Sequence, residues 1–232
     1  MFHRRVIPLI AVVGVCAVHA TPAAAQVSDK DKICSQIENR TFTVGTWASY
    51  KWTGGPSGGS TMRMAVVGKE PHEGKPYYWY EVAIEDPRRP DAKMIMQMLV
   101  PSLGGGSVRS VVMKSGDQPA MRMPPQMIQM INSAPGMNMA AEMTRACHEM
   151  EVVGWEQVTV PAGQFRALHL KHPRQTMVSE VWLQPDQQFA MIKGTLKDGG
   201  VMELAAQGTG ATSSITETPV EMPGLPGVPP PH

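Results

Sequence analysis

Four strand-like runs between Gly154 and Gly208 decide the fold of this chain: GWEQVTVPAGQFRALHLK (154–171), TMVSEVWL (176–183), FAMIKGTLK (189–197) and VMELAAQG (201–208). These runs are rich in residues that favour strands, and turn-forming residues separate them. Within the first run, Val160-Pro161-Ala162-Gly163 suits a type I turn, with the glycine taking up positive φ nearby. Consecutive strands joined by short turns usually pair with their neighbours, so this stretch predicts an antiparallel meander.

Further strand patterns precede the meander, beginning at Thr41 and continuing over 61–68, 77–85, 93–100 and 108–114. In the third of these, Tyr78, Tyr80, Val82 and Ile84 share one face, and Glu81 and Glu85 lie on the other. Lys93–Val100 is apolar on nearly both faces, which predicts a central strand covered on both sides. The predicted fold class is therefore α+β and mainly β, with one large antiparallel sheet.

Helical patterns occur at two places. Ser28–Arg40 has a capping Ser28 or Asp29, with Ile33 and Ile37 four residues apart on one face. Between 124 and 150 the apolar period also becomes helical, and Pro135-Gly136 divides this stretch into two predicted helices. We expect these two helices to pack on the sheet or to cap its open side.

The first 25 residues have the layout of a secretory signal peptide. A short basic start precedes an apolar run at Val6–Val18, and Ala23-Ala24-Ala25 follows as the cleavage site. A retained anchor is the alternative, but the apolar run is shorter than the roughly 20 residues that span a bilayer. We expect a periplasmic or secreted protein without a transmembrane segment after cleavage. The expected organisation is a single domain over 26–217 and a disordered, Pro-rich tail over 218–232.

The net charge limits the range of partners. Loss of Arg4 and Arg5 with the leader would lower the net charge from +1 to about −1, which gives no electrostatic basis for binding nucleic acid.

Removal of the leader would also remove Cys16, one of the three cysteines. The remaining Cys34 and Cys147 are expected to form a disulfide in an oxidising compartment, the alternative being two separate buried thiols.

No catalytic signature survives inspection. Gly55-Pro56-Ser57-Gly58-Gly59 matches G-x-S-x-G, but strands flank it on both sides where a hydrolase needs a strand followed by a helix. His148-Glu149 lacks the second histidine of H-E-x-x-H, since Val152 holds that position. The sequence predicts neither an enzyme nor a bound metal or cofactor.

Methionine is unusually frequent, with 19 in the chain. Three interpretations stay open: ordinary core side chains, the wall of an adaptable apolar cavity, or thioether ligands for Cu(I). Strand alternation puts Met94, Met96 and Met98 on one face at steps of about 7 Å, which suits a wall better than one ion. The candidate ligand-lining residues are Met62, Met64, Met94, Met96, Met98, Met127, Met130 and Met143.

The motifs V-P-A-G-x-F (Val160–Phe165) and V-W-L-x-P-D (Val181–Asp186), within a chain of this element order, resemble exported bacterial proteins of the lipoprotein-carrier (LolA-like) superfamily. The resemblance covers about Gly154–Glu217, and the earlier half is similar in element order alone. It implies a strongly curved sheet, like an unclosed barrel, around apolar space and lidded by helices. It also implies binding of acyl chains or similar ligands without chemistry, and it transfers no individual ligand-binding residue.

The expected function is thus a non-catalytic periplasmic binding or carrier protein for an apolar ligand such as a lipid or acyl chain. The helices of 124–150 would act as the lid. Two alternatives remain: a Met-rich Cu(I)-binding protein, or a structural or interaction protein of the cell envelope that uses the Pro-rich tail as its contact. The sequence identifies no protein partner.

Overall fold

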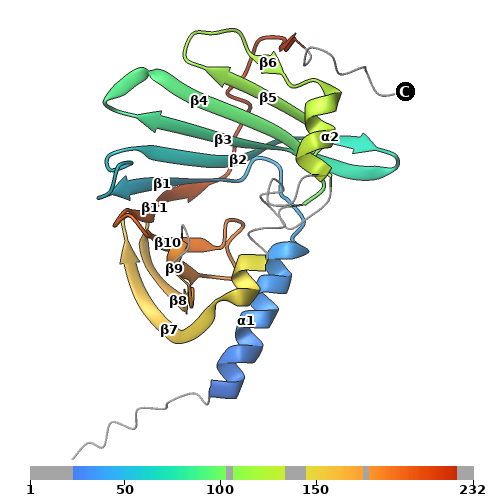
Figure 1. The fold of residues 1–232 in the computed structure, drawn as a ribbon. Coiled ribbons are helices and arrows are strands. Elements are labelled where there is room, and N and C mark those ends of the chain that lie inside the picture. The colour runs from blue at the N-terminus through green and yellow to red at the C-terminus, as the bar shows by residue number, and fades with distance from the viewer. Residues whose placement is uncertain (1–22, 103–106, 134–144, 175–177, 224–232) are drawn as a thin grey trace, which may run out of the picture.

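The computed structural model describes residues 23–102, 107–133, 145–174 and 178–223 of the chain (Figure 1). The predicted leader, Met143 and most of the Pro-rich tail lie outside these ranges. No helix in the described ranges is long and apolar enough to cross a membrane.

One twelve-stranded sheet dominates the fold, and its strand order is β12-β6-β5-β4-β3-β2-β1-β11-β10-β9-β8-β7. All pairs are antiparallel except β12 with β6. The two ends of the sheet are different strands, so it is unclosed, which confirms the predicted mainly-β class and the large antiparallel sheet. The strands are β1 (Trp47–Thr53), β2 (Thr61–His72), β3 (Lys75–Asp86), β4 (Arg89–Val100), β5 (Ser110–Ser115), β6 (Met121–Arg122), β7 (Glu151–Val160), β8 (Gly163–Lys171), β9 (Val178–Leu183), β10 (Met191–Leu196), β11 (Val201–Gly208) and β12 (Val220–Glu221).

The predicted meander is present as β7 to β11, each strand pairing with the next. The first run supplies two strands, because the chain turns between Val160 and Gly163. Gly163 has φ 131°, a region that L side chains rarely adopt, as the turn requires. Strand β11 then pairs with β1, which joins the meander to the first half of the sheet.

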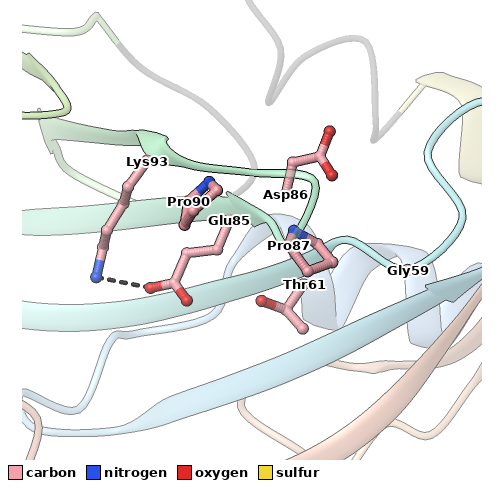
Figure 2. A pocket seen from close by; sticks show the side chains of 7 residues that line it. All are labelled: Gly59, Thr61, Glu85, Asp86, Pro87, Pro90 and Lys93. Atoms are coloured by element: carbon pink, nitrogen blue, oxygen red, sulfur yellow. Dashed lines mark ion pairs between the residues drawn. The ribbon is translucent and has the colours of Figure 1, made fainter.

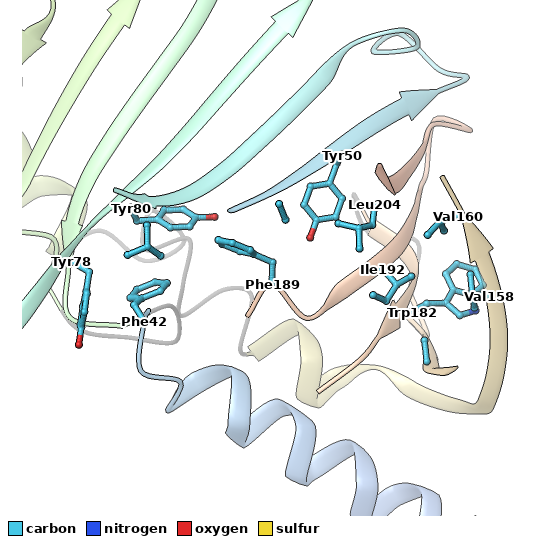
Figure 3. Close-up of a cluster of buried hydrophobic side chains, with 13 residues drawn as sticks. Phe42, Tyr50, Tyr78, Tyr80, Val158, Val160, Trp182, Phe189, Ile192 and Leu204 are labelled. Atoms are coloured by element: carbon cyan, nitrogen blue, oxygen red, sulfur yellow. The ribbon is translucent and has the colours of Figure 1, made fainter. Parts of the chain in front are cut away.

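The main core lies along the sheet and is rich in aromatic rings (Figure 3). It includes Tyr50 of β1, Leu204 of β11 and Val160 of β7, although β7 is the far edge of the sheet. The Ala162 amide, in the β7–β8 turn, donates to the Leu204 carbonyl at 3.1 Å. The meander therefore curves back on itself. Burial raises the pKa values of Tyr50 and Tyr80, and the Tyr50 hydroxyl donates to the Met191 carbonyl at 3.0 Å.

Helix α1 (Ala23–Glu38) runs beside the β7–β9 part of the sheet, where the sequence predicted a helix over Ser28–Arg40 (Figure 1). Its Ile33 and Cys34 pack in a second core with Leu168 and Leu170 of β8. The predicted Cys34–Cys147 disulfide is confirmed, with the two Cα atoms 5.8 Å apart. It joins α1 to a short helical segment at 145–149.

Helix α2 (Pro125–Ser133) lies beside the β3–β5 part of the sheet (Figure 1). It and the helical residues 145–149 fall within the predicted helical stretch of 124–150. Residues 134–144, between them, lie outside the described ranges.

The chain after β11 crosses one face of the first half of the sheet. Glu81 of β3 is only 1% exposed there, and it accepts hydrogen bonds from Gln97 Nε2 (2.8 Å), from the Ser214 amide (2.9 Å) and from Ser214 Oγ (2.7 Å). Beyond this segment, Val220–Glu221 pairs with β6, whereas the sequence predicted a disordered tail from residue 218. Backbone pairing orders these residues although their side chains bury little apolar area.

The surroundings of strand β4 differ from those that the sequence predicted. Ile95, Gln97 and Leu99 are buried on one face, but Met96 and Met98 on the other are only half-buried, and Met94 is exposed. The prediction that both faces are covered is therefore wrong for the methionine face. Apolar composition indicated burial, but the covering segments lie mainly on the opposite side.

Candidate functional site

An unbroken row of apolar side chains crosses seven strands on one face of the sheet. Direct register partners in antiparallel strands point to the same face. The partners run in order from β1 to β12: Ala48, Met64, Val82, Met96, Met113, Met121 and Val220. We call these seven residues the methionine row.

Burial falls along the row from the centre of the sheet to its edge. Ala48 is fully buried, and Met64, Val82, Met96 and Met113 are half-buried. At the edge, Met121 is 36% exposed and Val220 is 51% exposed. The outer part of the row is thus an apolar surface that its own fold covers only in part.

Aromatic side chains close the inner end. The Tyr80 hydroxyl donates to Met64 Sδ at 2.8 Å, which fixes this thioether against the main core. Phe42 stacks on Tyr80 with ring centroids 5.9 Å apart, and Phe189 lies 6.3 Å from the same ring. The protein's own side chains therefore fill the centre of the sheet (Figure 3).

Helix α2 covers one flank of this face. Ile128 is buried against Val108 and Val111, and Met96, Met98 and Met113 pack on this small cluster. Asn132 fixes the end of the helix, because its Oδ1 accepts from the Val108 amide at 2.9 Å and its Nδ2 donates to the Val108 carbonyl at 2.8 Å. Asn132 therefore links the C-terminal end of α2 to the chain just before β5.

The structure brings together five of the eight methionines predicted to line a ligand site. Met62 pairs with Ile84, and Ile84 pairs with Met94, in a second apolar line beside the row. The five are Met62, Met64, Met94, Met96 and Met98. On α2, Met127 is half-buried and Met130 is 46% exposed, and neither contributes to the four apolar clusters. Met143 lies outside the described ranges.

Two row members, Met113 and Met121, were missed by sequence reasoning. Met113 sits in the predicted strand 108–114, where alternation gives its face but not its cross-strand neighbours. Met121 belongs to a two-residue strand, too short for a periodic signal. Their placement depends on strand pairing, which the local sequence does not contain.

A separate pocket of about 320 Å³ lies at the β3–β4 turn and is lined by Gly59, Thr61, Glu85, Asp86, Pro87, Pro90 and Lys93 (Figure 2). Lys93 Nζ forms an ion pair with Glu85 Oε1 at 2.7 Å. Hydrogen bonds from Arg88 lower the pKa of Asp86 to about 2. Its charged lining suits an apolar ligand poorly, and none of the predicted methionines lies in it.

A buried histidine near Trp182 is the strongest candidate for acid–base chemistry. Both oxygens of Glu156 are occupied, Oε1 by His169 Nδ1 at 2.8 Å and Oε2 by Trp182 Nε1 at 3.0 Å. The hydrogen bond from Trp182, followed by that from His169, lowers the pKa of Glu156. His169 Nε2 lies 3.3 Å from Glu180, although the geometry is not that of a good hydrogen bond. Nδ1 is thus paired with Glu156, and Nε2 lies against a second carboxylate, that of Glu180.

In the described ranges, no group of three or more His, Cys, Asp or Glu side chains is arranged to hold a metal ion. Methionine thioethers, by contrast, do come together, since Met96, Met113 and Met121 are direct partners on consecutive strands. The candidate site is therefore an open, apolar, thioether-rich sheet face flanked by a helix.

Comparison with known proteins finds solved structures of low similarity. No family model and no curated protein sequence matches the chain. The crystal structure of MucB is 14% identical with a TM-score of 0.38, covering 84% of this chain and 62% of that one. The MucA/MucB complex of Pseudomonas aeruginosa is 12% identical with a TM-score of 0.46, covering 81% and 58%. An exported protein with a YmcC-like fold from Bacteroides fragilis is 13% identical with a TM-score of 0.36, covering 72% and 97%.

The chain thus spans about three-fifths of the length of the MucB structures. Similarity of this degree concerns the fold and carries no argument about ligand or partner. Membership of the lipoprotein-carrier superfamily stays a prediction.

Proposed function

We propose that this protein is an exported, non-catalytic binding protein that holds an acyl chain or a similar apolar ligand along the methionine row. The observation that carries the proposal is the unbroken apolar row, whose outer part is only partly covered. Thioether side chains are flexible and polarisable, so they adapt to ligands of varied shape. A contiguous exposed apolar surface of this kind is typical of a binding site.

The length of the row suits an acyl chain. Met64 and Met121 are separated by four strand spacings, or about 19 Å at ~4.8 Å each. Acyl chains of one lipid leaflet span about 15 Å, half of the ~30 Å hydrocarbon core. At ~4.8 Å per strand, a chain lying across the strands would contact about four consecutive members of the row.

Burial energies give a measurable affinity. A dozen methylenes contribute roughly 10 kcal/mol at about 0.8 kcal/mol each. Lost translational and rotational freedom offsets this by at least about 4 kcal/mol. The remainder, at most about 6 kcal/mol, corresponds to a Kd of about 40 μM or weaker.

A fluorescence titration with dansyl-labelled undecanoic acid tests this proposal. Met113→Asp places a charge in the middle of the row and is expected to weaken binding about tenfold or more, because burying an unpaired carboxylate is costly. Val153→Asp is the matched control, since Val153 is a 50% exposed apolar residue of β7 outside the row. Equal binding by both variants, or none by the unmodified protein, would contradict the proposal.

A Cu(I) site is the second candidate, favoured by the three thioethers on consecutive strands. Soft thioether ligands select Cu(I) over harder cations. Competition against a chromophoric Cu(I) chelator tests this, with Met113→Leu as the variant that removes the central sulfur but keeps the apolar surface. Retention of full affinity by that variant would exclude the row as the copper site.

A further inference from the structure

Four of the five side chains from Met64 to Met121 along the row are thioethers. Leucine would supply a similar apolar surface, but only the thioether is readily oxidised. The row therefore has a chemical property that an aliphatic acyl-binding surface lacks.

The exposure of these sulfur atoms is graded. Met121 lies one strand in from the sheet edge and is the most exposed methionine of the row, whereas Met96 and Met113 are half-buried beside α2. Met64, at the inner end, has its sulfur engaged by the Tyr80 hydroxyl. A hydrogen bond to a sulfur lone pair lowers its nucleophilicity, so reactivity should decrease from the edge inward.

We propose that the methionine row is an oxidation site, at which hydrogen peroxide converts thioethers to sulfoxides and thereby weakens ligand binding. The ligand part of this proposal rests on the proposed function. The sulfur lone pair attacks one oxygen of hydrogen peroxide, the S–O bond forms and the O–O bond breaks. The departing hydroxide takes the remaining proton and leaves as water, so sulfur loses two electrons and peroxide gains them.

The sulfoxide changes the face from apolar to polar. Its oxygen needs a hydrogen-bond donor, and the neighbouring methionines and valines of the row offer none from their side chains. An acyl chain lying on an oxidised row would bury that oxygen without a partner, which is unfavourable. Sulfoxides are reversible through methionine sulfoxide reductases, so the surface can be restored.

Peptide mapping by mass spectrometry during exposure to hydrogen peroxide tests the chemistry without any ligand. Met121 is expected to oxidise first in the row, Met96 and Met113 next, and Met64 last. Met150 is the internal control, because it is only 5% exposed within the second core. Oxidation of Met96 and Met113 at the rate of Met150 would overturn the assignment of the row as an oxidation site.

The functional consequence is measured on the same samples with the dansyl-labelled fatty acid. Oxidation is expected to weaken binding about tenfold or more, the loss expected for a polar oxygen buried without a partner. The triple variant M96L/M113L/M121L should retain binding after oxidation, whereas M130L should not, since Met130 is more exposed than Met121 but lies outside the row.

The outcomes separate the two proposals. One outcome is that the methionines of the row oxidise, yet the oxidised protein binds the dansyl-labelled fatty acid as well as the untreated protein does. Control by oxidation is then overturned, and the proposed function stands. If untreated protein fails to bind the probe, both the proposed function and its control fail, while the mapping still decides the order of oxidation. Protection of binding by M130L alone would overturn the row as the responsible surface.

Discussion

Glu81 is a buried carboxylate that depends on several hydrogen-bond partners. Its carboxylate is held by Gln97 and Ser214, and Arg63 lies 3.6 Å away. Since Ser214 belongs to the segment that crosses the sheet after β11, Glu81 joins that segment to β3. A buried carboxylate with these partners fixes the position of the segment.

We expect Glu81→Ala to lower the free energy of unfolding by about 2–4 kcal/mol, because the buried Gln97 loses an acceptor and Ser214 loses both of its hydrogen bonds to the carboxylate. Urea denaturation measures the change. Glu85→Ala on the same strand is the control, and its exposed ion pair with Lys93 should contribute less than about 1 kcal/mol. Equal destabilisation by the two variants would contradict this account of Glu81.

Glu156 should contribute a pH-dependent stability. Its pKa is lowered in the folded protein, first by the hydrogen bond from Trp182 and then by His169. A lowered folded-state pKa stabilises the fold above the ordinary value of 4.5, and the contribution is lost as pH falls through the folded value. Because Glu156 is 43% exposed, solvent weakens the effect.

The test compares unfolding free energies of the unmodified protein and Glu156→Gln between pH 3 and pH 7, a range chosen around the reference value. We expect a constant difference above about pH 5.5 that shrinks below the ordinary value. A difference that grows as the pH falls would show that the sign is wrong.

At the scale of elements, α2 is held by the buried Ile128 and by the hydrogen bonds of Asn132. Asn132 pairs with both backbone groups of Val108, so Asn132→Ala removes two hydrogen bonds and should loosen the helix by about 1–2 kcal/mol. Hydrogen exchange of Pro125–Ser133 is expected to accelerate. Gln129→Ala, at an exposed position of the same helix, is the control and should leave exchange nearly unchanged.

The disulfide is the corresponding anchor of α1. It closes a chain separation of 113 residues, for which loop entropy predicts about 4–5 kcal/mol of stabilisation. The double variant C34S/C147S should therefore show a markedly lower Tm in calorimetry. Two hydrogen bonds from Lys30, to His148 (3.0 Å) and Met150 (3.1 Å), would remain. An unchanged Tm would mean that these contacts and the packing of Ile33 suffice.

The elements that sequence predicted well are those fixed by local chemistry. The turn at Val160–Gly163 and the alternation of Tyr78 and Tyr80 depend on neighbouring residues, and the meander followed from them. The methionine row depends instead on register between strands distant in sequence. Met113 meets Met96 across β4 and β5, and no periodic pattern contains that pairing. Composition also predicted that both faces of β4 are covered, because it does not show which distant segments pack on each face. In the structure mainly one face is covered.

Across the whole molecule, the sheet has two differently occupied halves. The meander half surrounds the main core and is covered by α1, while the β2–β6 half has one face crossed by the C-terminal segment and the other only partly covered by α2. Partial cover is the physical basis of the proposed function, since a fully filled face would have no apolar area for a ligand.

Photocrosslinking tests this central claim most directly. A fatty acid with a diazirine in its chain would be irradiated with the purified protein, and the adducts would be located by peptide mapping. We predict adducts on β4, β5 and β6, concentrated at Met96, Met113 and Met121, and competed away by unlabelled fatty acid. Adducts at the polar pocket around Asp86, an even spread over the surface, or no competable adduct would contradict binding along the methionine row.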